Sequence, residues 1–268
     1  MPEVVDDLGR LFRLAGPPRR IVSLVPSLTE TLFALGCGDR LVGVTRYCVE
    51  PAGAVERVER VGGSKNPDVA RIVSLRPDLV IVNAEENRRE DFSAFEAAGL
   101  QVFVTFSRRV GDLPSLFERL GQLTGSQAAA EHLIAGVQQL LSGGEGQGGE
   151  TPPRVFCPIW KNPWMSFNAD TYAHDVLRLA GGANICADHP ERYPVVCLDA
   201  VATAAPQVIL LPDEPYVFQP KDLPALAPLA ETPAMRCGRV HFIDGKALSW
   251  YGPRAITAVR TVRAALEV

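Results

Sequence analysis

The pentapeptide RIVSL occurs twice in this chain, at residues 20–24 and 71–75, in two different contexts. The first copy is a β-branched run followed by a proline, and the residues from Ser27 to Glu30 then have the spacing of a helix capping box. Gly36 follows at the distance expected of a residue that ends a short helix. The first copy is therefore predicted to be a buried strand that leads into a helix.

The second copy follows Asn66-Pro67-Asp68, which predicts a helix cap with proline at the first helical position. Its apolar residues fit one face of a helix, and Pro77 ends the pattern. We therefore expect the second copy to be helical and the next apolar run, Leu79–Val82, to be the strand. The same five residues are predicted to adopt two structures because their neighbours differ.

The unit of short helix, proline, apolar strand and acidic loop returns later in the chain. VSLRPDLVIVNAEEN is echoed by ATAAPQVILLPDEP, which places Pro77 against Pro206 and Leu79–Val82 against Val208–Leu211. Continuous apolar strands that alternate with helices indicate parallel sheets covered on both faces. The chain of 268 residues has a natural length for two such lobes.

The expected fold class is α/β, with two Rossmann-like α/β lobes. The predicted boundaries are 1–124 for the N-terminal lobe, 125–153 for a connecting helix and Gly-rich linker, and 154–268 for the C-terminal lobe. Apolar residues with helical spacing predict helices within 113–123, 133–141 and about 253–266. Strands are expected at Ile21–Val25, Leu41–Thr45, Leu79–Asn83, Val102–Phe106, Arg154–Ile159, Val208–Leu211 and Val240–Ile243.

Charge and composition exclude several classes of partner. A net charge of −4 and a pI near 5.7 give no basic surface for nucleic acid. The sequence has no apolar run of the ~18–20 residues that a membrane span needs. The first twenty residues carry acids where a signal peptide needs a basic start, so the sequence as it stands predicts a cytoplasmic protein. We expect it to be a monomer. A leader upstream of Met1 would instead predict a periplasmic or cell-surface protein.

The six cysteines are scattered without a CxxC pair and are expected to be free thiols.

The loops that follow the predicted strands carry most of the large aromatic residues. Ligands of open α/β sheets bind outside the carboxyl ends of the strands, so these loops are the candidate binding surface. Aromatic rings in such loops suit a wall that stacks on a flat ligand; the alternative is that they pack the loops against the sheet ends. The residues concerned in the second lobe are Trp160, Trp164, Tyr216, Trp250 and Tyr251. Tyr193, in a polar loop, is expected to belong to the same stacking wall.

The corresponding loops of the first lobe are polar. They offer hydrogen-bonding and charged groups for an amphiphilic ligand, although the run EENRRED equally fits a solvated helix start. In the second lobe, Arg254 at a predicted helix start would bind a negative group of the ligand. The first-lobe candidates are Tyr47, Lys65, Asn66, Glu85, Asn87 and Arg88.

Signals for catalysis are weak. The sequence contains no GxSxG or P-loop motif, and we assign no catalytic residue. His174 and His189 lie near loops, which leaves direct metal binding as a further alternative.

Several longer stretches resemble the helical-backbone (class III) solute-binding proteins of ABC importers. They are GPPRRIVSLVPSLTETLFALGCGDRLVGVT, VARIVSLRPDLVIV, DVLRLAGGANI and the closing GPR helix, and the resemblance extends from about Val4 to Leu266. It implies two α/β lobes joined by one long helix, matched by about Ser126–Leu141, with the ligand held between the lobes. The likeness is strongest to the cobalamin-binding branch, in which Tyr47 and Tyr193 match residues that line the cleft.

The resemblance implies a binding protein rather than an enzyme. The implied ligand is cobalamin or another metal chelate, bound as a corrinoid or iron chelate, with no cofactor required. The implied partner is an ABC permease, contacted through Asp199 and through Asp68. The alternative function is that of an intracellular enzyme or cofactor-handling protein built on the same scaffold.

Overall fold

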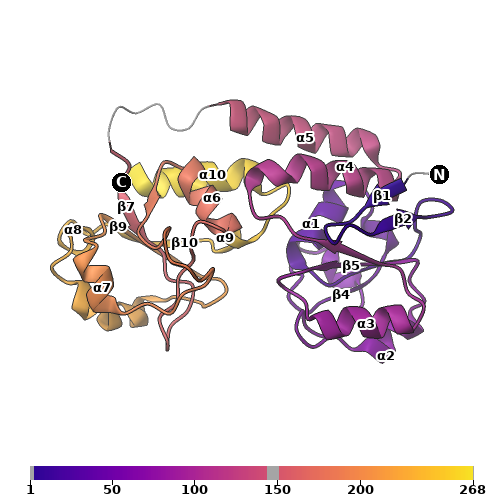
Figure 1. The fold of residues 1–268 in the computed structure, drawn as a ribbon, viewed down its shortest axis with the longest axis horizontal. Helices are drawn as coiled ribbons and strands as arrows, with labels where there is room; N and C mark the ends of the chain where they lie inside the picture. Colours follow the sequence, from indigo (N-terminus) through magenta and orange to yellow (C-terminus); the bar gives the residue numbers. More distant parts are fainter. Residues whose placement is uncertain (1–2, 144–150, 268) are drawn as a thin grey trace. The chain divides into compact units, whose positions relative to one another are not determined.

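Two parallel four-stranded sheets organise the chain, one in each of two units (Figure 1). The computed structural model describes residues 3–143 and 151–267. Unit 1 comprises Met1–Ser107 with Asp112–Gln138, and unit 2 comprises Arg108–Gly111 with Gln139–Val268. The predicted Gly-rich linker lies partly outside the described residues.

The two sheets have the same topology. Their strand orders are β4-β3-β5-β6 in unit 1 and β8-β7-β9-β10 in unit 2, and every neighbouring pair is parallel. The predicted α/β class with two parallel sheets is therefore confirmed, and so is the internal repeat that pairs β5 with β9. The strands are β3 Ile21–Ser23, β4 Leu41–Val44, β5 Leu79–Asn83, β6 Val102–Thr105, β7 Arg154–Phe156, β8 Ala183–Asn184, β9 Val208–Pro212 and β10 Val240–Ile243.

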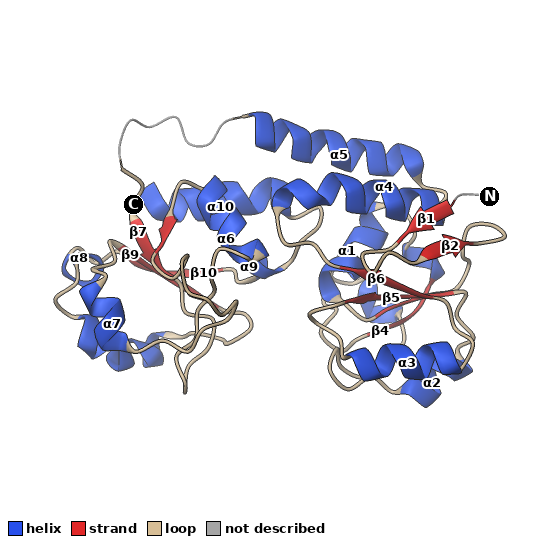
Figure 2. Cartoon of the chain, viewed as in Figure 1, coloured by secondary structure: helices blue, strands red, loops and turns tan. Residues whose placement is uncertain are grey.

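Helices cover both faces of the unit 1 sheet (Figure 2). On one face, Val80 and Val82 of β5 pack in a buried cluster with Ile72 of α2 and with Phe92 and Phe95 of α3. Figure 2 shows α1 and α4 on the opposite face. The helical segments are α1 Pro26–Ala34, η1 Gly38–Arg40, η2 Val55–Arg57, α2 Val69–Ser74, α3 Arg89–Ala97, η3 Val110–Asp112, α4 Leu113–Thr124 and α5 Gln127–Ser142.

The unit 2 sheet is covered in the same way. Ile209 and Leu211 of β9 pack in a second buried cluster with Leu198 of α7 and with Leu226 and Leu229 of the 3-10 helix η4. Figure 2 shows α6 and α10 on the other face. The helical segments are α6 Tyr172–Leu179, α7 Leu198–Thr203, η4 Pro220–Leu229, α8 Pro233–Arg236, α9 Lys246–Ser249 and α10 Ala255–Glu267.

In each sheet, an arginine at the start of the first strand donates hydrogen bonds to the end of a helix. That helix, α2 or α7, leads into the third strand, which lies beside the first in the sheet. In unit 1, Arg20 donates from Nε and Nη2 to the carbonyl oxygen of Leu75, at 2.9 and 2.7 Å. In unit 2, Arg154 Nε and Nη2 donate to the carbonyl of Ala205, at 3.1 and 2.8 Å, and Nε also reaches Ala204 O at 3.1 Å. These carbonyls end α2 and α7, where positive charge is favoured.

The backbone N–H and C=O groups of each arginine also form hydrogen bonds with the residue that precedes the third strand, β5 or β9. Asp78 accepts from the Arg20 N–H at 2.9 Å, and Gln207 accepts from the Arg154 N–H at 3.0 Å. Their own N–H groups donate back to Arg20 O at 2.8 Å and to Arg154 O at 2.7 Å. Each pair fixes where two adjacent parallel strands begin, and hence where their carboxyl ends lie.

The second copy of RIVSL is confirmed as a helix, with an N-cap two residues later than the proline pattern predicts. Asp68 is the N-cap of α2, and its side chain accepts from the Arg71 N–H at 2.9 Å. The capping box predicted at Ser27 is wrong, because α1 begins one residue earlier at Pro26. The Ser27 hydroxyl is instead buried, without a hydrogen-bond partner among the described residues.

A two-stranded antiparallel hairpin, which the sequence analysis did not predict, lies along the outer strand β6. It is formed by β1 Glu3–Val5 and β2 Leu11–Arg13. Its turn supplies Asp6, whose carboxylate accepts from the Val104 N–H at 3.2 Å, and Asp7, whose N–H donates to Val104 O at 3.0 Å. These contacts satisfy backbone groups that an edge strand leaves exposed.

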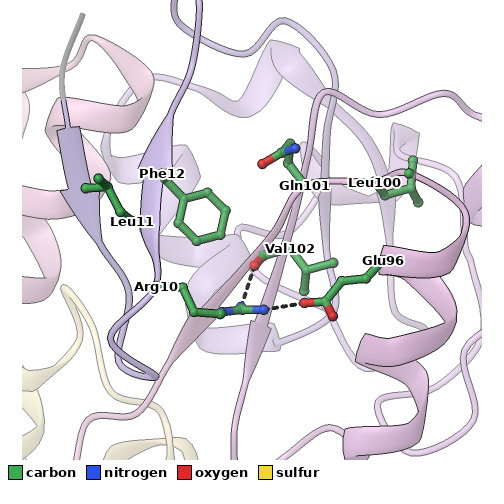
Figure 3. A pocket seen from close by; sticks show the side chains of 8 residues that line it. Arg10, Leu11, Phe12, Glu96, Leu100, Gln101 and Val102 are labelled. Atoms are coloured by element: carbon green, nitrogen blue, oxygen red, sulfur yellow. Dashed lines mark hydrogen bonds and ion pairs between the residues drawn. The ribbon is translucent and has the colours of Figure 1, made fainter.

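The hairpin also borders a shallow groove of about 290 Å³ (Figure 3). Arg10 lies across this groove, forms an ion pair with Glu96 and donates to Val102 O at 2.7 Å. Val102 is the first residue of β6, so the groove lies at the amino end of that strand rather than beside the loops predicted to bind a ligand.

Replacing Arg154 with Met removes three hydrogen bonds to the last carbonyls of α7. We expect the free energy of unfolding to fall by about 1–2 kcal/mol, measured by urea denaturation. Arg13→Met is the matched control, because its ion pair with Glu3 is exposed, and it should cost less than about 0.5 kcal/mol. Equal losses in the two variants would contradict this role for Arg154.

Candidate functional site

In unit 2, the loops that follow β7 and β8 pair with each other as extended segments. The loop after β7 folds back on itself, because Ile159 N donates to Met165 O at 2.8 Å and Met165 N donates to Trp160 O at 3.1 Å. Met165 in turn forms an antiparallel bridge with Val195 in the segment after β8. Trp160 therefore lies on a turn whose two sides are fixed by backbone hydrogen bonds.

Four aromatic side chains from the loops after β7 and β9 form one connected cluster. Trp160 meets Tyr216 edge-on, with ring centroids 5.8 Å apart, and Tyr216 lies 4.6 Å from Phe218. Phe218 stacks on Trp164 at 5.9 Å with an interplanar angle of 9°. Phe218 is buried and Trp160 is 43% exposed, so the cluster runs from the core of unit 2 to its surface. We call Trp160, Trp164, Tyr216 and Phe218 the aromatic cluster.

Apolar and aromatic side chains from neighbouring positions in the same loops are exposed as well. Val217 follows Tyr216 in the chain and is 54% exposed. Tyr193 and Val195, in the segment that bridges to Met165, are also exposed, and Arg192 lies over the Tyr193 ring at 5.9 Å. Exposed apolar groups gathered in this way are typical of a binding surface.

A buried carboxylate lies beside the aromatic cluster. Asp222 of η4 is 3% exposed, and its Oδ1 accepts from Lys161 Nζ at 2.7 Å and from the Tyr216 hydroxyl at 3.2 Å. Its Oδ2 accepts from the Gln219 N–H at 2.9 Å. The Lys161 ammonium holds the pKa of Asp222 below its usual value, and Asp222 raises the pKa of Lys161. Both groups are therefore charged at neutral pH.

Sequence analysis missed Asp222, Phe218 and the exposed valines. The signal for Asp222 was its position three residues after Gln219, next to a proline, which is the spacing of a helix-capping pair. Nothing in the spacing indicated that its second oxygen would face Lys161.

Trp250 and Tyr251 lie apart from the aromatic cluster, and each is 4% exposed. The Trp250 Nε1–H donates to Glu214 Oε1 at 2.8 Å, while Arg254 and Lys246 lie over the indole at 5.4 and 5.9 Å. Tyr251 packs edge-on against the buried Tyr172 at 6.0 Å. These contacts enclose both rings within unit 2, and a ligand-binding role for them and for Arg254 stays a prediction.

Burial raises the pKa of Glu214, although the hydrogen bond from Trp250 opposes this effect. The folded state therefore binds the proton of this carboxyl more tightly than the unfolded chain does. The contribution of Glu214 to stability is present at low pH and is lost as pH rises through its folded pKa.

In unit 1, the loops after β4 and β5 expose polar and charged groups. Tyr47 is 53% exposed, with the Arg46 guanidinium 5.2 Å from its ring centre. Arg46 also donates to Asn66 Oδ1 at 3.3 Å, and Lys65 Nζ donates to Glu85 O at 2.6 Å. The structure thus brings together four predicted residues of unit 1: Tyr47, Asn66, Lys65 and Glu85.

Asn87 lies beneath this surface and connects three segments. Its Oδ1 accepts from the Asn83 N–H at 2.8 Å, and its Nδ2 donates to Leu24 O at 3.1 Å and to Ser64 O at 2.9 Å. Asn87 is 4% exposed, so its amide orders the loops after β3 and β5. Its neighbour Arg88 is exposed and pairs with Asp91 at 3.4 Å.

The two acids predicted to contact a permease are both exposed and begin equivalent helices. Asp68 caps α2, and Asp199 lies in the first turn of α7. Both helices precede the third strand of their sheets, β5 and β9. The helices correspond in the internal repeat, but the two acids do not, because Asp199 aligns with Ala70 and Asp68 with Cys197, the N-cap of α7.

The alternative of direct metal binding concerns His174 and His189. Across residues 3–143 and 151–267, no three His, Cys, Asp or Glu side chains gather as a metal site would require. His174 is half-buried, and its Nδ1 lies 3.4 Å from Asn184 Nδ2. Burial lowers the pKa of His174. In the same described ranges, no helix combines the length and apolarity that crossing a membrane requires.

Residues 21–247 match the model of a protein family described as periplasmic binding protein. A vitamin B12-binding protein of Vibrio cholerae serotype O1 is 28% identical over 194 residues, which cover 72% of this chain and 70% of the relative. A vitamin B12-binding protein of Yersinia pestis is 30% identical over 196 residues, with 72% and 69% covered.

Solved structures with the same fold include receptors for different ligands. The periplasmic vitamin B12 binding protein BtuF of Vibrio cholerae superposes with a TM-score of 0.81 at 26% identity, covering 94% of this chain and 97% of that one. The periplasmic heme-binding protein BhuT, in complex with two hemes, gives 0.79 at 28% identity, covering 94% and 100%. The molybdate-binding protein MolA of Haemophilus influenzae gives 0.83 at 17% identity, which shows the fold alone.

Glu214 allows a test of the buried carboxyl that requires no ligand. Glu214→Gln removes the titration but keeps a carbonyl oxygen for the Trp250 N–H. We expect the stability of the variant, relative to the parent, to increase as pH rises above the ordinary carboxyl pKa of about 4.3. Urea denaturation at pH 4 and at pH 7 measures this difference. The exposed Glu3→Gln serves as the control, and a difference independent of pH would contradict the raised pKa.

Proposed function

Because the chain belongs to the periplasmic binding protein family, a family of binding proteins rather than enzymes, we propose that it is the solute-binding receptor of an ABC importer. We propose further that its ligand is a flat metal chelate of the cobalamin or heme class. This proposal replaces the alternative of an intracellular enzyme.

The observation that carries the proposal is the exposure of the aromatic cluster at the carboxyl ends of the unit 2 strands. Trp160 keeps 43% of its surface exposed although it contacts Tyr216. Val217, next to Tyr216 in the chain, and Val195, which is bridged to Met165, are exposed as well. A planar macrocycle covers such a surface by stacking and by excluding water, which suits corrins and porphyrins alike. Similar proteins that bind vitamin B12 and heme support the same ligand class.

Polar groups of unit 1 would bind the periphery of the ligand. Tyr47, Lys65, Asn66 and Arg88 are exposed, and they offer donors for the amide or carboxylate side chains that surround such macrocycles. Glu85 would accept from ligand amides. Tyr193, exposed beside Val195, would extend the stacking surface of unit 2, and Arg254, at the start of α10, would bind a negative group.

We propose that the permease is contacted through Asp68 and Asp199. They are exposed, negatively charged and placed at the starts of corresponding helices of the two repeats. Similar solved proteins are described as periplasmic, and we propose that this protein also acts outside the cytoplasmic membrane.

Titration of the purified protein with cyanocobalamin and, separately, with hemin tests the ligand class. Trp160→Ala should weaken binding of the true ligand by at least about tenfold, because it removes the exposed stacking ring. The free energy of unfolding should change by less than about 1 kcal/mol, since the residue lies at the surface.

Phe242→Ala is the matched control. Phe242 lies on β10 in the same unit and is 44% exposed, nearly the same as Trp160, but it lies within a strand and not in the loops. The Phe242→Ala variant should bind cyanocobalamin or hemin with the same affinity as the parent protein. Failure of the parent protein to bind either compound would contradict the proposed ligand class, and an equal loss in the two variants would contradict the proposed surface.

A further inference from the structure

Resting on the proposed function, we infer that Asp222 is a positioning residue that sets the orientation of Trp160 and Tyr216. It does so by accepting hydrogen bonds from the residue that follows Trp160 in the chain and from the ring that contacts Trp160. The inference rests on three groups of contacts within unit 2.

The chain neighbour of Trp160 and the ring that contacts it both form a hydrogen bond with one oxygen atom. Lys161 follows Trp160 in the chain, and Tyr216 meets the indole edge-on at 5.8 Å. Lys161 Nζ and the Tyr216 hydroxyl donate to the same Oδ1 of Asp222, at 2.7 and 3.2 Å. Asp222 thus joins the loop after β7 to the loop after β9 at the point where Trp160 is exposed.

The other oxygen anchors this arrangement to the core of unit 2. Asp222 Oδ2 accepts from the Gln219 N–H at 2.9 Å at the start of η4, and Leu226 and Leu229 of the same helix are buried against the sheet. Capping η4 needs only Oδ2. The contacts of Oδ1 are therefore additional to capping, and they are the ones that reach the aromatic cluster.

Lys161 and Asp222 form an ion pair beside the aromatic cluster. The Asp222 side chain is 4% exposed and the Lys161 side chain 18%, so the pair is largely withdrawn from water. A buried carboxylate needs a cationic partner, and Lys161 supplies it. Lys161 and Tyr216 thus each direct a donor to Asp222, beneath the exposed ring of Trp160.

Asp222→Asn tests the role of this carboxylate. An amide has one acceptor oxygen, so it can retain the Lys161 and Tyr216 donors or the Gln219 N–H, but not both sets. The first readout uses no ligand. The fluorescence of Trp160 is obtained as the difference between each protein and the same protein carrying Trp160→Phe. In Asp222→Asn we expect this fluorescence to shift to longer wavelength and to be quenched more strongly by acrylamide.

The second readout is a double-mutant cycle with cyanocobalamin or hemin as the probe, whichever the parent binds. Asp222→Asn should weaken binding about tenfold in the parent background and have little further effect when Trp160 is already Ala. A defect that acted through general stability would weaken binding equally in both backgrounds.

Asp175→Asn is the matched control. Asp175 is also a buried carboxylate of unit 2, 6% exposed, and it accepts from the Val110 N–H at 2.8 Å and from Arg178 at 3.0 Å. This control should lower the melting temperature without changing the Trp160 fluorescence. An unchanged Trp160 signal in folded Asp222→Asn, or an equal change in Asp175→Asn, would overturn the inference. If the parent binds neither probe, the proposed ligand class fails, while the fluorescence still decides whether Asp222 positions Trp160.

Discussion

The hydrogen bonds from one arginine in each unit determine where the strands of its sheet begin and where the loops that follow them emerge. Arg20 and Arg154 stand at the start of the first strand of each sheet and donate to the last carbonyls of α2 and α7. Each helix leads directly into the third strand, so these contacts align two neighbouring parallel strands. Because the strands are short, an alignment set at their amino ends also fixes their carboxyl ends, where the loops diverge. The repeated topology therefore supplies two equivalent platforms, and the loops alone make them different.

The two platforms differ in what their loops expose. In unit 1 the buried side-chain amide of Asn87 forms hydrogen bonds with backbone groups of three segments. The exposed groups of the same loops, such as Tyr47 and Lys65, are polar. In unit 2 the corresponding loops are aromatic, and their polar groups are paired beneath the rings. The two sets of loops therefore differ in chemistry although the sheets that carry them share one topology.

The sequence predicted what depends on local pattern and missed what depends on contacts across the chain. The apolar runs after Pro77 and Pro206 identified β5 and β9 because a buried parallel strand is continuous in hydrophobicity. The capping box at Ser27 was wrong because Pro26 already begins the helix. The β1–β2 hairpin was missed because each strand has only three residues and its support comes from β6, some ninety residues away. Asp222 was missed for the same reason, since Lys161 lies 61 positions earlier.

Trp160 and Trp250 show why residue type and position after a strand do not suffice to predict whether an indole is exposed. Each follows a strand of the same sheet and has a lysine nearby in the chain. At Trp250, Lys246 and Arg254 lie over the indole while Glu214 takes its N–H, so the ring is enclosed. At Trp160, Lys161 is drawn away to Asp222, and the ring keeps 43% of its surface exposed. The two indoles thus differ in the partner of the lysine nearby in the chain, and at Trp160 that partner is a carboxylate distant in sequence.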